Sequence, residues 1–335
     1  MAGGQERVLR RRIRSIEATK KITRSFELIA ASQIARAQGR IAGSRPYARA
    51  ISDILAATVK ESGSSTRLLG VPESPSNVLA LVIVADRGLA GAYNSSVLRS
   101  TERLIRAGVA KGQNYKVMAV GKKAQAYFRF RHQPVERQFV GMSDRPSFDD
   151  ARRVAGSIVP LFLEGEVDLV QIVSTRVRSA SRQFVETRQL LPVLASEPPP
   201  RVTPDRAGPS SMVVEPDPLD AVAPEPGHQL GFFEFEPDGE QLLAALIPQY
   251  VEAAVYAALL EASASEHAAR QRAMSAATEN AEELLKTLRR VMNRARQDTI
   301  TTEIMEIVGG SEALRAAAGH ARDLTYPQAT EEQTV

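Results

Sequence analysis

The sequence predicts an α/β protein: a long antiparallel coiled coil of the N- and C-terminal helices, with a Rossmann-like α/β domain inserted between them. Helical patterns with few breaks occupy both ends of the chain. In the middle, short apolar runs alternate with amphipathic segments, which is typical of a largely parallel sheet covered by helices. The composition agrees, because 43% hydrophobic residues suffice for one core, whereas 5% aromatic residues and no Trp favour elongated helical packing elsewhere.

The N-terminal helix is expected over residues 1–62. A heptad pattern places small and apolar residues on one seam. These residues are Leu9, Ile13, Ile16, Ala30, Ile34, Ala37, Ile41, Ala48, Ile51 and Leu55. Between Arg7 and Arg49 basic residues dominate, and Glu17 and Glu27 are the only acidic ones. This segment therefore suits an acidic or phosphate-bearing partner, or it is simply solvated.

The central α/β domain is expected over residues 75–195 together with 231–238. Apolar runs that begin at Asn77, Tyr115 and Val167 predict buried strands, and the amphipathic segments between them predict helices. Because parallel strands need crossover connections, this order implies a largely parallel sheet.

Residues 196–230 are rich in proline, so we predict that they form a flexible insertion and not a helix or a central strand.

The C-terminal helix follows over residues 240–318, and residues 319–335 are expected to be a disordered tail. Neither long helix can bury its narrow apolar stripe alone, so we expect the two to pair as a coiled coil. The alternative is that each helix binds another protein.

No catalytic, cofactor or metal site is expected. The chain has no Cys, which excludes disulfides and thiolate ligands. Its histidines are scattered without ligand spacing at His132, His228, His267 and His320. The segment from Asp86 to Gly91 follows a strand but lacks the spacing of a phosphate loop, so it predicts a turn. No stretch approaches the roughly 18 to 20 apolar residues of a membrane span, so we expect no direct membrane insertion.

Three stretches carry a resemblance to a known family. They are "LRRRIRSIEATKKITRSFELIAASQIARAQ" from Leu9, "DRGLAGAYN" from Asp86 and "SEHAARQRAMSAATENAEELLKTLRRVMNRARQDTITTEIMEIVGG" from Ser265. Together they resemble, in the family's order, the gamma subunit of bacterial F-type ATP synthases. The resemblance implies a non-catalytic rotor shaft that couples ion translocation through the membrane sector to ATP synthesis or hydrolysis at a catalytic ring. It also implies a share in regulating ATPase activity and proton flow.

The resemblance further implies partners and contact residues. The partners are the alpha and beta subunits of the catalytic hexamer, the epsilon subunit and the membrane c-ring, at the cytoplasmic face of the plasma membrane and without nucleic acid. The implied catalytic-ring contacts are Lys20, Lys21, Arg24, Arg270, Arg296, Gln297, Thr301 and Glu303. An apolar bearing is implied at Ile304, Ile307 and Val308, and a membrane-ring contact is implied at Phe233, Phe235 and Glu236. Without the resemblance, these groups would be a solvated basic face, an ordinary amphipathic helix end and an edge strand.

Two other functions fit parts of the sequence. A nucleic-acid-binding coiled coil would use the basic N-terminal helix, and its binding would depend steeply on salt. An enzyme built on the central domain would bind a nucleotide saturably, although the missing phosphate loop counts against it. The acidic, Pro-rich insertion is either a passive spacer or a contact with a stator or rotor neighbour that restrains ATP hydrolysis.

Overall fold

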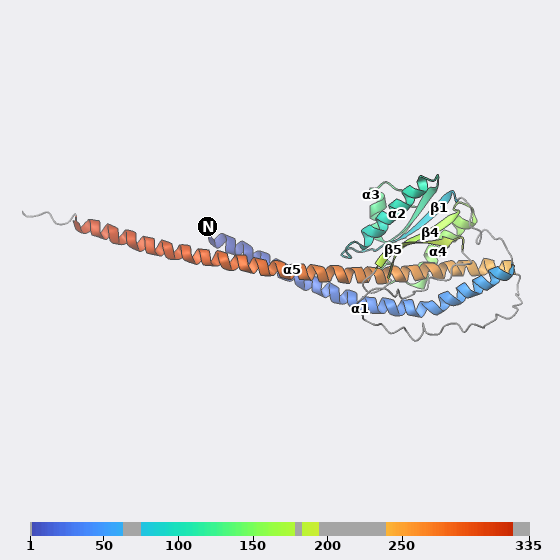
Figure 1. Ribbon diagram of the computed structural model, residues 1–335, viewed down its shortest axis with the longest axis horizontal. Helices are drawn as coiled ribbons and strands as arrows, with labels where there is room; N and C mark the ends of the chain where they lie inside the picture. Colours follow the sequence, from blue (N-terminus) through green and yellow to red (C-terminus); the bar gives the residue numbers. More distant parts are fainter. Residues whose placement is uncertain (1, 63–74, 178–182, 194–238, 324–335) are drawn as a thin grey trace, which may run out of the picture. The chain divides into compact units, whose positions relative to one another are not determined.

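A computed structural model gives the protein's structure at residues 2–62, 75–177, 183–193 and 239–323 (Figure 1). The chain forms two compact units, Met1–Ser25 with Ser275–Val335 and Phe26–Met274, which are described one at a time. Two long helices contribute to both units, α1 (Ala2–Ser62) and α5 (Gly239–Asp323). The expected insertion at 196–230 lies outside the described residues, as do residues 231–238 and 324–335.

The Phe26–Met274 unit is built on a five-stranded sheet of order β3-β2-β1-β4-β5. Its strands are β1 (Asn77–Ile83), β2 (Asn114–Val120), β3 (Arg137–Phe139), β4 (Leu169–Val177) and β5 (Gln183–Leu191). The first four strands pair in parallel, and β5 runs antiparallel to β4. The predicted α/β class, with a parallel-rich sheet and a long C-terminal helix, is confirmed.

Helices cover both faces of this sheet (Figure 1). They are α2 (Tyr93–Val109), α3 (Lys122–Phe130), α4 (Phe148–Leu163) and α5. Alternate residues of β1 serve the two faces, as the two-residue period of a strand requires. Val78 and Val82 pack with residues of α2 and α3, whereas Leu79 and Leu81 pack with residues of α4 and α5. Both faces are therefore buried, which explains the continuous apolar runs of the central strands.

In the other unit, Ile13 of α1 packs against Leu285 and Leu288 of α5. Farther along α1, the Thr23 and Thr278 hydroxyl oxygens lie 2.8 Å apart. Residue numbers thus fall along α5 as they rise along α1, so these two segments run in opposite directions. The described contacts between these segments thus combine a small cluster of large apolar side chains with a polar pair of threonines.

Helix α5 contains an 18-residue window with a mean hydropathy of 1.5, long and apolar enough to cross a membrane by length and composition. The sequence expectation did not anticipate such a window. Only 39% of it is buried inside the protein. Core helices meet the same criterion, and α5 buries Leu243, Ile247 and Val251 completely in the core beside the sheet. The window alone therefore does not identify a membrane span.

Candidate functional site

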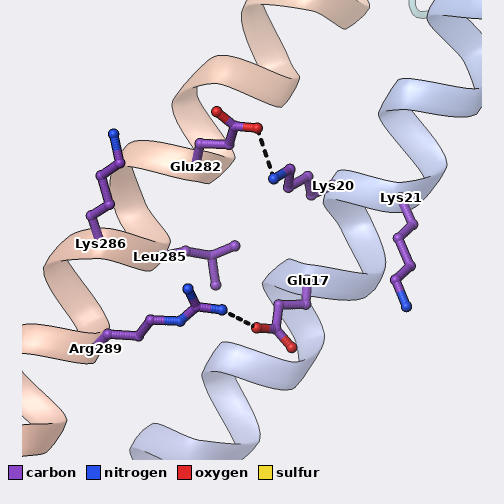
Figure 2. A pocket seen from close by; sticks show the side chains of 7 residues that line it. All are labelled: Glu17, Lys20, Lys21, Glu282, Leu285, Lys286 and Arg289. Atoms are coloured by element: carbon purple, nitrogen blue, oxygen red, sulfur yellow. Dashed lines mark hydrogen bonds and ion pairs between the residues drawn. The ribbon is translucent and has the colours of Figure 1, made fainter.

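A shallow groove of about 460 Å³ lies in the Met1–Ser25 and Ser275–Val335 unit (Figure 2). Charged side chains from both helices surround one leucine in it, and the lining residues are Glu17, Lys20, Lys21, Glu282, Leu285, Lys286 and Arg289. Two ion pairs cross between the helices: Lys20 Nζ lies 2.7 Å from Glu282 Oε1, and Arg289 Nη2 lies 2.6 Å from Glu17 Oε1. These pairs link the two helices, although each is exposed and contributes at most about 1 kcal/mol.

Lys20 and Lys21 differ in what they offer to a partner. Lys20 is partly exposed and forms an ion pair with Glu282. The hydrogen bond from the Lys20 ammonium group, together with its positive charge, lowers the pKa of Glu282. Lys21 is exposed, and Figure 2 shows its side chain directed away from α5. Arg24 is also exposed. The outward face expected from the sequence is thus exposed at Lys21 and Arg24, and Lys20 pairs with Glu282 across the two helices.

Farther along α5 in the same unit, all the implied contact residues from Arg296 to Val308 are exposed. The Thr301 hydroxyl donates to the Gln297 carbonyl at 3.0 Å, so it is engaged within its own helix. The apolar side chains are open to solvent, with exposed fractions of 54% at Ile304 and 72% at Ile307. Leu9 of α1 packs with the cluster that includes Met292, which precedes all of these residues on α5.

Exposed apolar residues continue beyond the bearing expected from the sequence. Ile300 and Met305 lie beside it on α5, and Leu314 lies one to two turns farther on. A contiguous apolar surface with polar neighbours is typical of a protein-binding site. Met305 is not among the residues expected from the sequence, because the resemblance implies a bearing at Ile304, Ile307 and Val308 alone.

Arg270 does not belong with the other implied contacts. It lies in the Phe26–Met274 unit with an exposed fraction of 9% and pairs with the Glu266 carboxylate. Its Nη2 also donates to the Gly88 carbonyl at 3.4 Å. We therefore assign Arg270 a role inside this unit. The implied membrane-ring residues Phe233, Phe235 and Glu236 lie outside the described residues.

The turn that follows β1 is organised by the Asp86 carboxylate. Its oxygens accept from the backbone amides of Lys122 at 3.0 Å, Gly141 at 2.9 Å and Ser143 at 3.2 Å. Lys122 is the first residue of α3, and a helix N-terminus beside a parallel strand is where such folds bind phosphate. Here the Asp86 carboxylate accepts from these amides, so it occupies the place where a phosphate would bind. The expected turn is confirmed, and its geometry disfavours an enzyme that binds a nucleotide here.

His267 lies beside this turn with an exposed fraction of 2%. Its Nε2 lies 3.3 Å from the Asp144 carbonyl oxygen and 3.6 Å from the Asp144 carboxylate, and its Nδ1 lies 3.4 Å from Arg270 Nη1. These contacts suit a neutral ring that donates from Nε2. Burial lowers the pKa of His267, and the Arg270 charge adds to the effect, although Asp144 and Glu266 oppose it.

This lowered pKa predicts a loss of stability in mild acid. The unfolded chain takes up a proton at His267 near its ordinary pKa of about 6.5, whereas the folded chain resists protonation. The His267 contribution is therefore complete above about pH 6.5 and declines as the pH falls toward the folded-state pKa. We expect the urea midpoint of the purified chain to fall between pH 7 and 5, and to fall less in His267→Gln. An equal pH dependence in both proteins would contradict this.

Comparisons with known proteins agree over almost the whole chain. A family model described as ATP synthase matches residues 5–314. An ATP synthase gamma chain from Parafrankia sp. (strain EAN1pec) is 42% identical over 319 residues, covering 94% of this chain and 99% of the relative.

Two solved structures share the fold. A chain of the Euglena gracilis mitochondrial ATP synthase, solved with OSCP, F1 and the c-ring, aligns with a TM-score of 0.61 and 19% identity, covering 99% of this chain and 100% of that one. A chain of the Tetrahymena thermophila mitochondrial ATP synthase central stalk and c-ring aligns with a TM-score of 0.53 and 21% identity, covering 76% and 99%.

Proposed function

The chain belongs to the family of ATP synthase gamma chains, and from this premise we propose that it turns as the central shaft coupling ion translocation to ATP synthesis or hydrolysis. The observation that carries the proposal is family membership over nearly the full length of both chains. As a gamma subunit, the chain belongs to a membrane-associated complex. The catalytic sites would lie in other subunits, so this chain would be non-catalytic.

We include an antiparallel coiled coil in the proposal, formed by residues 1–62 and 240–318. The packing of Ile13 with Leu285 and the Thr23 to Thr278 hydrogen bond support it in one unit. The remaining parts would be an α/β domain of residues 75–195 with 231–238, an insertion of 196–230 and a tail of 319–335. A thin shaft with few large apolar side chains suits rotation, because strong apolar anchors would hold it in one position.

The exposed surfaces support two contacts with a catalytic ring of alpha and beta subunits. The exposed basic side chains of Lys21 and Arg24 suit acidic loops, since charge attraction is long-ranged and can re-form at successive positions. The exposed stripe at Ile304, Ile307 and Val308 suits an apolar bearing, with Arg296 and Gln297 beside it as polar contacts. Epsilon and the c-ring are the further proposed partners, at the cytoplasmic face of the plasma membrane.

Removing the basic charges tests the proposed ring contact. We expect Lys20→Ala, Lys21→Ala and Arg24→Ala together to lower the ratio of ion pumping to ATP hydrolysis about threefold or more, because exposed charges each contribute about 0.2 to 1 kcal/mol and three of them together contribute about 0.6 to 3 kcal/mol. The measurement uses membrane vesicles that contain the assembled complex. A matched control removes Arg99, Arg103 and Lys111, which are exposed on or just after α2. An unchanged ratio in the first variant would rule out the assigned contact.

A further inference from the structure

One stretch of α5 is enclosed on every side. All residues from Ala262 to Arg270 are buried within the Phe26–Met274 unit, although a helix at the surface of a domain normally leaves one face exposed. Small side chains, including Ala264 and Ala268, let neighbouring backbone come close. The stretch nevertheless carries charged and polar groups, so each must find a partner inside the protein.

The partners come from several separate elements. Tyr93 at the start of α2 donates its hydroxyl to the Ala262 carbonyl at 3.1 Å. Ser263 donates to the carbonyl of Asp144, in the loop after β3, at 3.0 Å. The Arg270 guanidinium reaches the Gly88 carbonyl in the turn after β1.

The last two strands complete the enclosure. Ser265 donates its hydroxyl to the Thr175 carbonyl of β4 at 3.0 Å. Its own carbonyl accepts from Gln183 Nε2 of β5 at 2.9 Å, and the Gln183 amide oxygen accepts from Arg272 at 2.7 Å. We name this set of contacts around residues 262–272 the collar. It consists of directional hydrogen bonds from the β1 turn, α2, the β3 loop, β4 and β5.

The collar occupies a particular place in the fold. The β1 turn, the β3 loop and the end of β4 all lie at the carboxyl ends of parallel strands. Doubly wound sheets bind their ligands at this edge. Here the edge holds a helix of the same chain, and that helix continues without a break to Asp323.

We propose that the collar is the joint that locks α5 to the α/β domain, so that torque passes between them without slip. This inference rests on the proposed shaft function. Glu266, His267 and Arg270 act as positioning residues in it. A rotation of α5 by one residue, about 100°, would misdirect every hydrogen bond of the collar at once.

The buried charges make slipping especially unfavourable. Glu266 is 1% exposed and pairs with Arg270, and its Oε2 has no hydrogen-bond partner among the described residues. The two residues lie one turn apart on α5 and move together, so a rotation of the helix would carry this buried charged pair away from the Gly88 carbonyl, and His267 away from the Asp144 carbonyl. A buried charged pair that loses such a contact is costly, whereas apolar residues of similar size at both positions leave no buried charge to satisfy. The contact between Arg270 and Gly88 thus orients the helix.

A crosslink tests whether the joint is rigid. A Cβ added at Gly91 would lie 3.6 Å from the Ala273 Cβ, within the disulfide range of about 3.5 to 4.5 Å, and the chain has no native Cys. Gly91 has a left-handed φ of 54°. Gly91→Cys alone should therefore lower the folding equilibrium constant about 5- to 140-fold, a cost of about 1 to 3 kcal/mol at about 1.4 kcal/mol per tenfold, which the single substitution measures. We expect the assembled complex with Gly91→Cys and Ala273→Cys to hydrolyse ATP and pump ions equally, within about twofold, when oxidised or reduced. Each single substitution is the control. Loss of activity on oxidation, with recovery on reduction, would show movement at the joint and overturn the proposal.

A second variant loosens the joint while preserving its packing. Glu266→Met with Arg270→Met removes the paired charges and keeps similar volume, so assembly and thermal stability should persist. We expect ATP hydrolysis to continue while ion pumping per ATP falls at least threefold. Adding the oxidised crosslink should restore pumping. The matched control is Asp149→Met with Arg152→Met, an exposed pair on α4.

The possible results distinguish a failure of the collar proposal from a failure of the proposed shaft function. The unmodified chain must first restore ATP-driven pumping to vesicles whose complex lacks this subunit, and failure at that step refutes the proposed function. If it succeeds, unchanged pumping per ATP in the loosened variant refutes the collar. A parallel loss of hydrolysis and pumping, or no rescue by the crosslink, also refutes it, because an ordinary structural defect would behave in that way.

Discussion

Replacing Gly121 with alanine is expected to destabilise the α/β domain by about 3 to 5 kcal/mol. Gly121 joins β2 to α3 with φ of 96°, a conformation that residues with a Cβ rarely adopt. A Cβ there would lie 2.2 Å from the Val84 carbonyl oxygen. That oxygen belongs to the backbone at the end of β1 and cannot move without disturbing the sheet. Urea unfolding of the purified chain measures the effect.

Gly112 provides a control that separates conformational strain from collision. Its φ of 81° is also left-handed, but a Cβ there meets nothing within 4 Å. Gly112→Ala should therefore cost only about 1 to 2 kcal/mol. Equal losses in the two variants would show that strain alone matters and that the close approach to Val84 does not.

Shortening Ile247 to alanine should cost about 2 to 5 kcal/mol. Ile247 is fully buried, in the cluster where α5 packs with α4 and one face of the sheet. Removing its outer carbons leaves a cavity there, and packed neighbours relax only partly to fill it. The measurement is the shift in the urea midpoint at constant slope, which reports a change in stability without a change in exposed surface.

Ile307 lies on the same helix and offers the same substitution in an exposed position. Ile307→Ala should change the free energy of unfolding by no more than about 0.5 kcal/mol. A large loss of stability at Ile307 would mean that some part of the protein covers it. If Ile247→Ala has no effect, the assigned core contact between α5 and the sheet is wrong.

The sequence predicts the central fold well because fully buried parallel strands leave long apolar runs, as in β1 and β2. It does not predict β5, where four consecutive polar residues, Glu186 to Gln189, interrupt the apolar ones and most side chains are only half-buried. Nor does it predict β3, which is three residues long. Short or partly exposed strands depend on their neighbours more than on their own pattern.

The candidate site was harder to foresee from sequence. Lys20 and Glu282 are far apart along the chain, and only the alignment of two helices brings them within 2.7 Å. Charged residues at helical spacing predict a polar face of a helix, but they do not show which of them pair with charges on another helix. Arg270 shows a second difficulty. The Ala-rich sequence around it is typical of a solvent-exposed helix, whereas neighbouring elements bury Arg270 in the structure.

Asp86 gives the α/β domain a built-in anion. Its carboxylate accepts hydrogen bonds from the amide of Lys122 at the start of α3 and from two amides in the loop after β3. A bound phosphate would organise such a fold in much the same way. Domains that borrow this charge from a small molecule change shape as the molecule comes and goes. A domain that carries the charge on its own side chain needs no bound metabolite to hold these amides, which suits a part that has to stay stiff under mechanical load.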